Sequence, residues 1–280
     1  MKKLLLSGVA LIALTVGPAI AADLGKPVYK ALPPAPPPPP TWTGFYVGGH
    51  LGGAWETRGT AEVSDPLATI VIREPVSPGM NNTSAFLGGG QIGYNYQFSP
   101  NWLAGIEGDI SGTNLRASGS SNDFPTLDNT AVQFGSKVDW VASARARLGY
   151  VWSNSWLFYV TGGAAWADIK FNGNFLCPGL TCIGSDGLVA LGSGSSIDVT
   201  WVAGGGLQWR PVGQSWSLGV EYLYYGFDTN HNFPGTEFNA TTGAPVFFGE
   251  CTGIPCNLQF SIKDSNIQVA RVRFDWYFTP

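Results

Sequence analysis

The chain has 280 residues, and 12% of them are charged, about half the share found in an average soluble domain. Hydrophobic residues make up 44%, the mean hydropathy is +0.07 and the formal net charge is -4. This composition excludes a disordered chain, and the acidic balance argues against a nucleic-acid-binding surface. After the N-terminal stretch no run approaches the ~20 apolar residues of a membrane-spanning helix. An all-β protein remains, or a membrane protein whose apolar residues alternate with polar ones.

The N-terminus predicts a secretory signal peptide over 1–21. Lys2 and Lys3 precede an apolar stretch over 4–16, and a small-x-small pattern ends at Ala21. We expect cleavage between Ala21 and Ala22. An uncleaved anchor is the alternative, but the apolar stretch is short for a membrane span.

Residues 22–41 form a proline-rich segment, expected to be a periplasmic linker. Such a tract adopts polyproline II and acts as a stiff spacer of ~3.1 Å per residue. Such a tract is also a ligand for aromatic-lined grooves of other proteins, so a spacer and a recognition segment both stay open as interpretations. Peptidoglycan and periplasmic proteins are the partners considered for it.

From Trp42 onward the sequence alternates apolar with polar or small residues, the period of a β-strand. Eight segments of about 10 to 14 residues show it. Their apolar faces carry Phe45, Val47, Leu51 and Trp55; Phe86, Ile92, Tyr94, Tyr96 and Phe98; Trp102, Ala104, Ile106 and Ile110; Val138, Trp140, Ala142, Ala144, Leu148 and Tyr150; Trp156, Phe158, Val160 and Trp166; Val199, Trp201, Ala203, Leu207 and Trp209; Trp216, Leu218, Val220, Tyr222 and Tyr224; and Ala270, Val272, Phe274, Trp276 and Phe278.

The connections between these segments alternate in length. Three are short, around 99–101, 153–155 and 211–215, and four are long, at about 57–84, 112–136, 168–197 and 226–262. Short turns on one side and long loops on the other are typical of outer-membrane barrels. The sequence therefore predicts an all-β, eight-stranded antiparallel transmembrane up-and-down β-barrel over 42–280, with four extracellular loops. A soluble β-sandwich is the competing fold, but its outward faces would be charged. Aromatic residues beside the short turns predict an interfacial girdle: Trp102, Tyr150, Trp156, Trp209, Trp216 and Phe278.

The opposite, polar faces include Asp139 and Asp275, and several of their acidic and basic residues lie at matching heights above the short turns. We expect a charge network in the lumen formed by His50, Glu107, Asp109, Arg145, Arg147, Glu221, Arg271 and Arg273. Charges inside a small barrel must be paired, and eight strands leave an interior that side chains just fill. The prediction is a plugged lumen. A narrow ion path lined by the same residues is the rival interpretation.

Neither a metal site nor a cofactor site is predicted. The four cysteines form two C-x4-C pairs in long loops, Cys177 with Cys182 and Cys251 with Cys256. Export favours disulfides, and closure within each loop is the preferred of three pairings. The run 88–93 matches G-x-G-x-x-G, but it lies inside a strand pattern, where glycine marks a kink or close backbone approach.

Enzymatic chemistry has little support in the sequence. His231, expected on a loop near Asp228, is the weak general-base candidate, and a solvated loop histidine explains it equally well. We therefore expect a protein that is not an enzyme.

Several motifs resemble the alphaproteobacterial outer-membrane immunogenic proteins. The resemblance covers about 42–278 and implies a small porin-superfamily barrel of eight strands at the cell surface. The alternating aromatic residues Phe274, Trp276 and Phe278 resemble the C-terminal assembly signal of that family. The family's signal usually ends on an aromatic residue, whereas here Thr279 and Pro280 follow. The motifs run 42–49 (WTGFYVGG), 90–97 (GQIGYNYQ), 105–109 (GIEGD), 159–164 (YVTGGA), 219–222 (GVEY) and 272–278 (VRFDWYF).

Three functions follow as hypotheses. The first is a structural outer-membrane barrel that supports envelope integrity and displays surface loops. The second is porin-like passage of small solutes or ions. The third is capture of a ligand such as haem, or of a host surface, by the loops. Expected partners are outer-membrane lipid, lipopolysaccharide and the β-barrel assembly machinery, with no nucleic acid.

Overall fold

The computed structural model describes residues 41–56, 59–64, 79–81, 83–122, 130–178, 187–227, 229–245, 257–263 and 266–278. The expected cleavage site at Ala21 and Ala22, and the proline-rich segment up to residue 40, lie outside these ranges. No helix in the described ranges is long and apolar enough to cross a membrane. The strands are β1 (Gly44–Glu56), β2 (Thr60–Ser64), β3 (Thr83–Ser99), β4 (Trp102–Ser121), β5 (Ala131–Trp152), β6 (Trp156–Cys177), β7 (Leu188–Trp209), β8 (Trp216–Tyr225), β9 (Asn230–Asn239), β10 (Asn257–Lys263) and β11 (Ile267–Phe278).

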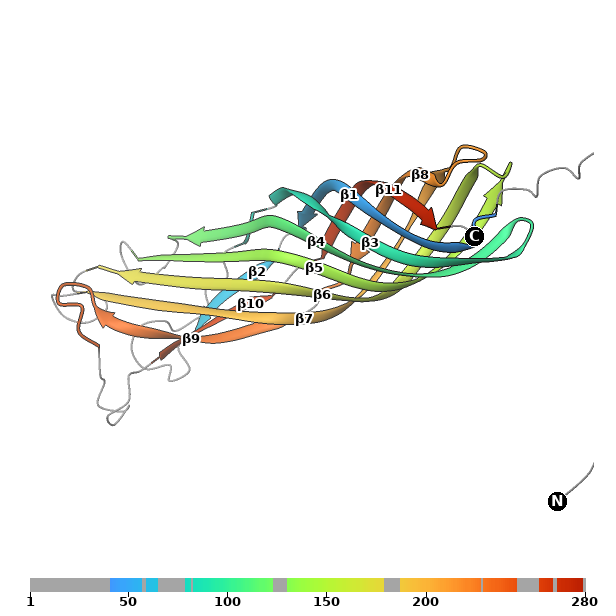
Figure 1. The fold of residues 1–280 in the computed structure, drawn as a ribbon. Coiled ribbons are helices and arrows are strands. Elements are labelled where there is room, and N and C mark those ends of the chain that lie inside the picture. Colours follow the sequence, from blue (N-terminus) through green and yellow to red (C-terminus); the bar gives the residue numbers. More distant parts are fainter. Residues whose placement is uncertain are drawn as a thin grey trace, which may run out of the picture. The chain divides into compact units, whose positions relative to one another are not determined.

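Eight of these strands close into a ring. Neighbours follow the order β1, β3, β4, β5, β6, β7, β8 and β11, and β11 pairs back with β1. Every pair in the ring is antiparallel, and Phe45 of β1 lies opposite Phe278 of β11. The expected eight-stranded antiparallel up-and-down barrel is confirmed (Figure 1).

Side chains on the ring alternate between its outer surface and its lumen, because successive residues of a strand point to opposite faces. Phe45 and Ile106 are 62% and 67% exposed, whereas their neighbours Tyr46 and Glu107 are 0% and 3% exposed. Large apolar side chains therefore cover the outside, whereas inside a polar layer lies between apolar side chains, such as Leu103 and Leu157 at one end and Leu87 and Leu223 at the other. This is the reverse of a water-soluble barrel and suits lipid as the surroundings.

Aromatic side chains encircle the outer surface of the barrel at the end that carries the short turns. Trp102 packs against Tyr150, with ring centroids 5.4 Å apart, and Trp209 lies between Trp156 (6.4 Å) and Trp216 (5.9 Å). A second group lies towards the other end, where Trp201 contacts Tyr224 and Trp55 contacts Tyr222. Between them runs the apolar belt that an outer-membrane barrel presents to lipid.

The strands on one side of the ring continue past the barrel. β4 reaches Ser121, β5 begins at Ala131, β6 reaches Cys177 and β7 begins at Leu188, all within segments expected to be long loops. β2, β9 and β10 lie in the other two such segments. The structure differs from the expectation because the polarity of the alternation reverses there, with polar residues outside and apolar residues inside. Strands recognised in the sequence by their apolar outer faces therefore end where this reversal begins.

We call this region the lobe: β2, β9, β10 and the ends of β4, β5, β6 and β7 that run beyond the barrel (Figure 1). β9 pairs with β7 and β10, and β10 pairs with β2. Residues 79–81 complete a second ring: Met80 N–H donates to Gly59 O (3.3 Å), and Asn81 N–H donates to Ser118 O of β4 (2.9 Å). The barrel and the lobe thus share four continuous strands.

The lobe has an apolar core, which is continuous with apolar side chains at that end of the barrel lumen, such as Leu87 and Val202. Its centre is Phe260 of β10, which is 0% exposed and lies 5.5 Å from the Phe233 ring and 5.8 Å from the Phe134 ring. Glycines on three strands make room for this ring. A Cβ at Gly173 or Gly192 would come within 2.6 or 2.8 Å of it, and one at Gly235 within 2.1 Å.

A β-bulge in β5 marks the boundary between barrel and lobe. Val138 pairs with Ile169 and Trp140 with Asp168, which leaves Asp139 unpaired. The extra residue reverses the alternation. Val138, expected on the outer face, is 4% exposed and lies in the lobe core, whereas Asp139, expected in the lumen, contacts surface lysines. Both expectations are wrong, because the sequence pattern does not reveal the bulge.

Candidate functional site

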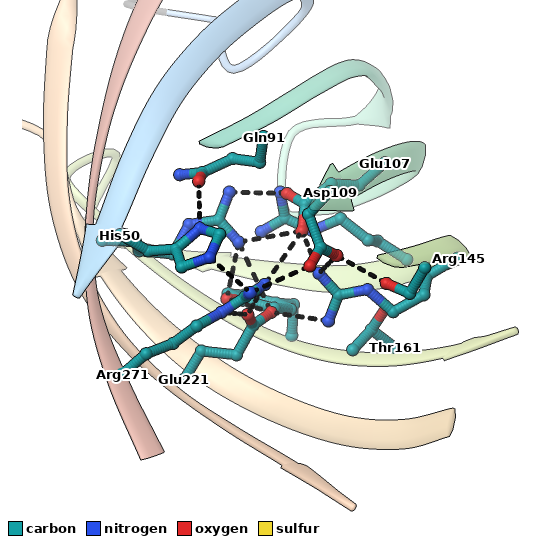
Figure 2. A network of polar contacts seen from close by, with 12 residues as sticks. His50, Gln91, Glu107, Asp109, Arg145, Thr161, Glu221 and Arg271 are labelled. Carbon is teal, nitrogen blue, oxygen red and sulfur yellow. Dashed lines mark hydrogen bonds and ion pairs between the residues drawn. The ribbon is translucent and has the colours of Figure 1, made fainter. Parts of the chain in front are cut away.

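The lumen holds one connected network of polar side chains to which all eight barrel strands contribute, and Figure 2 shows part of it. The structure brings all eight residues expected there into it, and adds others. The members are Tyr46 and His50 (β1); Gln91 (β3); Glu107, Asp109 and Ser111 (β4); Ser143, Arg145 and Arg147 (β5); Tyr159 (β6); Gln208 (β7); Glu221 (β8); and Arg271, Arg273 and Asp275 (β11).

Glu107 is the hub of the network. Its Oε2 accepts from Arg273 Nη2 (2.5 Å), from Arg147 Nη1 (3.1 Å) and from the Tyr46 hydroxyl (2.6 Å). Its Oε1 accepts from Arg145 and from Arg273 Nη1 (3.2 Å). Both carboxylate oxygens are therefore shared among three guanidinium groups.

Two further carboxylates link β5 and β11 across the lumen. Glu221 is paired with Arg271 (2.6 Å) and Arg145 (3.3 Å) and accepts from the Tyr159 hydroxyl (2.9 Å). Asp109 is paired with the same two arginines, at 3.0 and 2.9 Å. Each of these two arginines thus bridges Asp109 of β4 and Glu221 of β8.

Asp275 is a fourth carboxylate that the sequence interpretation places on the lumen face but leaves out of the charge network. It accepts from Arg273 Nε (2.9 Å) and from the amides of Gln91 (2.7 Å) and Gln208 (2.6 Å). Comparing heights on neighbouring strands misses it, because its cation lies two residues away on the same strand.

The hydrogen bonds fix the state of His50. Gln91 donates its amide to Asp275, so its Oε1 accepts from His50 Nδ1 (2.6 Å). Arg271 has only donors, so His50 Nε2 accepts from it (3.2 Å) and from the Ser111 hydroxyl (2.7 Å). His50 is therefore a neutral imidazole protonated on Nδ1.

The charges within the network balance. Four arginines, Arg145, Arg147, Arg271 and Arg273, face four carboxylates, Glu107, Asp109, Glu221 and Asp275. All eight side chains are buried. An isolated charge in low dielectric is very costly, so only a paired set is stable in this position.

Tyr46 and Tyr159 depend on glycines of the neighbouring strands. A Cβ at Gly93 would lie 2.3 Å from the Tyr46 hydroxyl, and one at Gly206 would lie 2.5 Å from the Tyr159 hydroxyl. The expectation that strand glycines mark a close approach holds at Gly93, the last residue of the 88–93 run. The glycines are the sequence signal that could have located both tyrosines.

Gly93→Ala is expected to lower the stability of the barrel by about 1–3 kcal/mol, because the methyl group displaces Tyr46 from Glu107. Urea unfolding in detergent, followed by the gel mobility of the folded form, measures the change. Gly49→Ala is the matched control, since its Cβ would meet only a backbone oxygen at 3.6 Å. Equal unfolding midpoints for the two variants would contradict the role of Gly93.

The short-turn end of the lumen is closed by aromatic residues around Arg210, which follows β7. The guanidinium lies 4.6 Å from the Tyr277 ring and 5.9 Å from the Trp42 ring, and Nη1 donates to Thr41 O (2.9 Å). Burial lowers the pKa of Arg210. Trp42 N–H donates to Gln97 Oε1 (3.0 Å), so the chain entering β1 is fastened to the barrel rim.

His231 is not the loop residue expected from the sequence. It lies in β9, is 8% exposed, pairs with Asp198 Oδ2 (2.7 Å) and stacks on Phe171 at 4.9 Å. The neighbouring Asp228 lies outside the described residues. The pair lies at the base of the lobe core, which makes it a structural contact between β9 and β7.

The cysteines are described only in part. Cys177 is buried, is disulfide-bonded and accepts from the Thr130 hydroxyl (3.2 Å). Cys182, Cys251 and Cys256 lie outside the described residues, so the expected pairing stays a prediction. In the described part of the chain no group of three or more His, Cys, Asp or Glu is arranged to hold a metal ion.

A closed ring of eight antiparallel strands, apolar outside and filled with paired charges inside, defines an outer-membrane-type β-barrel. Residues 31–244 match the family model of the outer membrane protein beta-barrel domain, and the chain belongs to this family. Two relatives, from Brucella melitensis biotype 1 and Brucella suis biovar 1, are each called 31 kDa outer-membrane immunogenic protein. Each is 29% identical over 228 residues, covering 80% of this chain and 86% of the relative. The expected family and the Gram-negative outer-membrane location are confirmed.

Two solved structures are among those to which the chain is similar. The outer membrane protein OprG from Pseudomonas aeruginosa has 9% identity and a TM-score of 0.44, over 84% of this chain and 96% of that chain. The attachment invasion locus protein Ail of Yersinia pestis has 14% identity and a TM-score of 0.30, over 84% and 99%.

Proposed function

We propose that the protein is a non-conducting structural barrel that supports the outer membrane and displays the lobe and its loops outside the cell. One observation carries this: the lumen charges form a buried, balanced network that reaches all eight strands. A solute path needs a water-filled passage through the lumen. Here each charged group of the network is paired with a group of opposite charge inside the lumen, which supports a plug.

Two further closures support the same function. The Trp42, Arg210 and Tyr277 cluster lies below the network, and the apolar lobe core around Phe260 lies beyond it. Both described chain ends lie on the short-turn side, which faces the periplasm in barrels of this type. The lobe therefore belongs on the extracellular side, and the proline-rich segment in the periplasm.

Assembly and export complete the proposal. Phe274, Trp276 and Phe278 alternate on the outer face of β11, 43%, 47% and 60% exposed, where the β-barrel assembly machinery would recognise them. The signal peptide is removed between Ala21 and Ala22. Peptidoglycan or a periplasmic protein is the proposed contact of the proline-rich segment.

The function is tested by conductance and envelope integrity together. The purified full chain is expected to give no large, stable openings in a planar bilayer, because buried, paired side chains occupy the lumen at the network. Deletion of the gene is expected to raise sensitivity to detergent, and the wild-type chain should restore resistance. Stable openings would favour the porin-like alternative, and unchanged detergent sensitivity would contradict envelope support.

A further inference from the structure

The basic residues outside the lumen are unevenly distributed. In the described part of the chain, four of the nine Lys and Arg residues belong to the network and Arg210 closes the short-turn end. Four remain outside the lumen, Arg116, Lys137, Lys170 and Lys263; Lys137 is half-buried and the other three are exposed. Three of these form a row across adjacent strands: Arg116 of β4 pairs with Lys137 of β5, which pairs with Lys170 of β6. We call them the basic row.

The bulge in β5 creates this row. Towards the short turns, the odd-numbered side chains of β5 point into the lumen, as Arg145 and Val141 do. Beyond the unpaired Asp139 the even-numbered ones point inwards, as Val138 and Phe134 do. Lys137 therefore points outwards only because of the extra residue. A bulge that re-aims one side chain into register with two others is a built feature.

The contacts of the row leave donors free for a ligand. Asp139 pairs with Lys137 and with Lys170 Nζ (2.5 Å), and the two lysine side chains are 38% and 55% exposed. Each ammonium has three donors, so Asp139 occupies a minority of them. Arg116 has no ion pair with any described residue. With Asp168 beside Lys170, three cations face two carboxylates, and the row has a net positive charge.

The height of the row places it in the lipid headgroup layer. Lys170 lies four residues beyond Trp166, and Lys137 lies three beyond Trp140, the last outward-facing aromatic residues of β6 and β5. At ~3.4 Å per residue and ~40° tilt, the cations lie roughly 8–10 Å beyond the apolar belt. The phosphate groups of outer-leaflet lipids lie in this layer.

We propose that Arg116, Lys137 and Lys170 bind the phosphate groups of a phosphorylated glycolipid in the outer leaflet. Guanidinium and ammonium donors make short, charge-assisted hydrogen bonds to phosphate oxygens. Asp139 holds the two lysines side by side. The glycolipid acyl chains then lie along the apolar belt next to Trp140 and Trp166. This proposal rests on the outer-membrane location and not on the lumen being closed.

The test uses the full chain folded in zwitterionic detergent and titrated with bisphosphorylated lipid A, with binding followed by native mass spectrometry. Substituting Gln for each cation is expected to weaken binding about fivefold, and the triple variant about a hundredfold. Asp139→Asn should strengthen binding, because it frees both lysines. That opposite sign separates ligand binding from a loss of folding.

Four controls distinguish binding of the lipid phosphates by the basic row from misfolding and from binding of free phosphate. Lys263→Gln should leave binding unchanged, and the gel mobility of each variant shows that it is folded. Lipid A without its phosphates should bind to wild type as weakly as bisphosphorylated lipid A binds to the triple variant, and inorganic phosphate should not displace lipid A. Wild-type affinity in the triple variant, or displacement by inorganic phosphate, would overturn the proposal.

Discussion

Arg273→Met is expected to destabilise the barrel by about 3–5 kcal/mol. Arg273 is 1% exposed and pairs with Glu107 (2.5 Å), Glu221 (3.4 Å) and Asp275 (2.9 Å). Removal of the guanidinium leaves four buried carboxylates with three arginines. Methionine keeps much of the apolar volume, so the loss reports charge and not a cavity. The measurement is urea unfolding in detergent, followed by the gel mobility of the folded form.

A matched control and a rescue accompany this variant. Arg116→Met removes an exposed arginine and should shift the unfolding midpoint little. Glu107→Gln added to Arg273→Met restores three acids facing three bases. The double variant should then lose less stability than the sum of the two single variants. Strict additivity, or an unchanged midpoint for Arg273→Met, would show that the network does not act as one unit.

Phe260→Ala is expected to open the lobe while the barrel stays folded. The ring fills the slot left by Gly173, Gly192 and Gly235, and its loss costs about 3–5 kcal/mol through lost burial and a cavity. Protease added to intact cells should cut the variant within the lobe much faster than wild type. The membrane-embedded fragments should remain folded and heat-modifiable.

Leu176→Ala is the control for Phe260→Ala. Leu176 also lies in the lobe, on β6, but points outwards and is 44% exposed, so its truncation should change the cutting rate little. Equal protease resistance of Phe260→Ala and wild type would contradict a lobe held together by this core. Loss of the heat-modifiable barrel in Phe260→Ala would contradict the expectation that the barrel stays folded when the lobe core is disrupted.

The membrane part of the fold is readable from the sequence, because apolar residues recur at every second position. The outward positions of Ile106 and Phe158 and the inward positions of Glu107 and Tyr159 all follow from that period. The lobe is not readable in the same way. Its strands place polar residues outside, and Phe233 and Phe260 inside, which is the alternation of an ordinary water-exposed sheet.

The remaining differences between the sequence-based expectation and the structure lie at the boundary between barrel and lobe and among the neutral residues of the network. One bulge residue, Asp139, exchanges the faces of Val138 and Lys137, and no composition signal announces it. The eight expected members of the network are His50 and seven acidic or basic residues, all on the polar faces of the predicted strands. Tyr46 and Tyr159 are neutral, and only the glycines opposite them mark where their rings lie.

The network joins parts of the chain that are far apart in sequence. Glu107 of β4 contacts Arg273 of β11, and β11 also completes the ring by pairing with β1. Until that seam closes, Glu107 and Arg273 are not paired with each other and His50 of β1 lacks its contact with Arg271 of β11, so reopening the seam separates several contacts at once. The folded barrel should therefore persist through a slow unfolding rate, a kinetic stability that outlasts what its equilibrium free energy alone would provide.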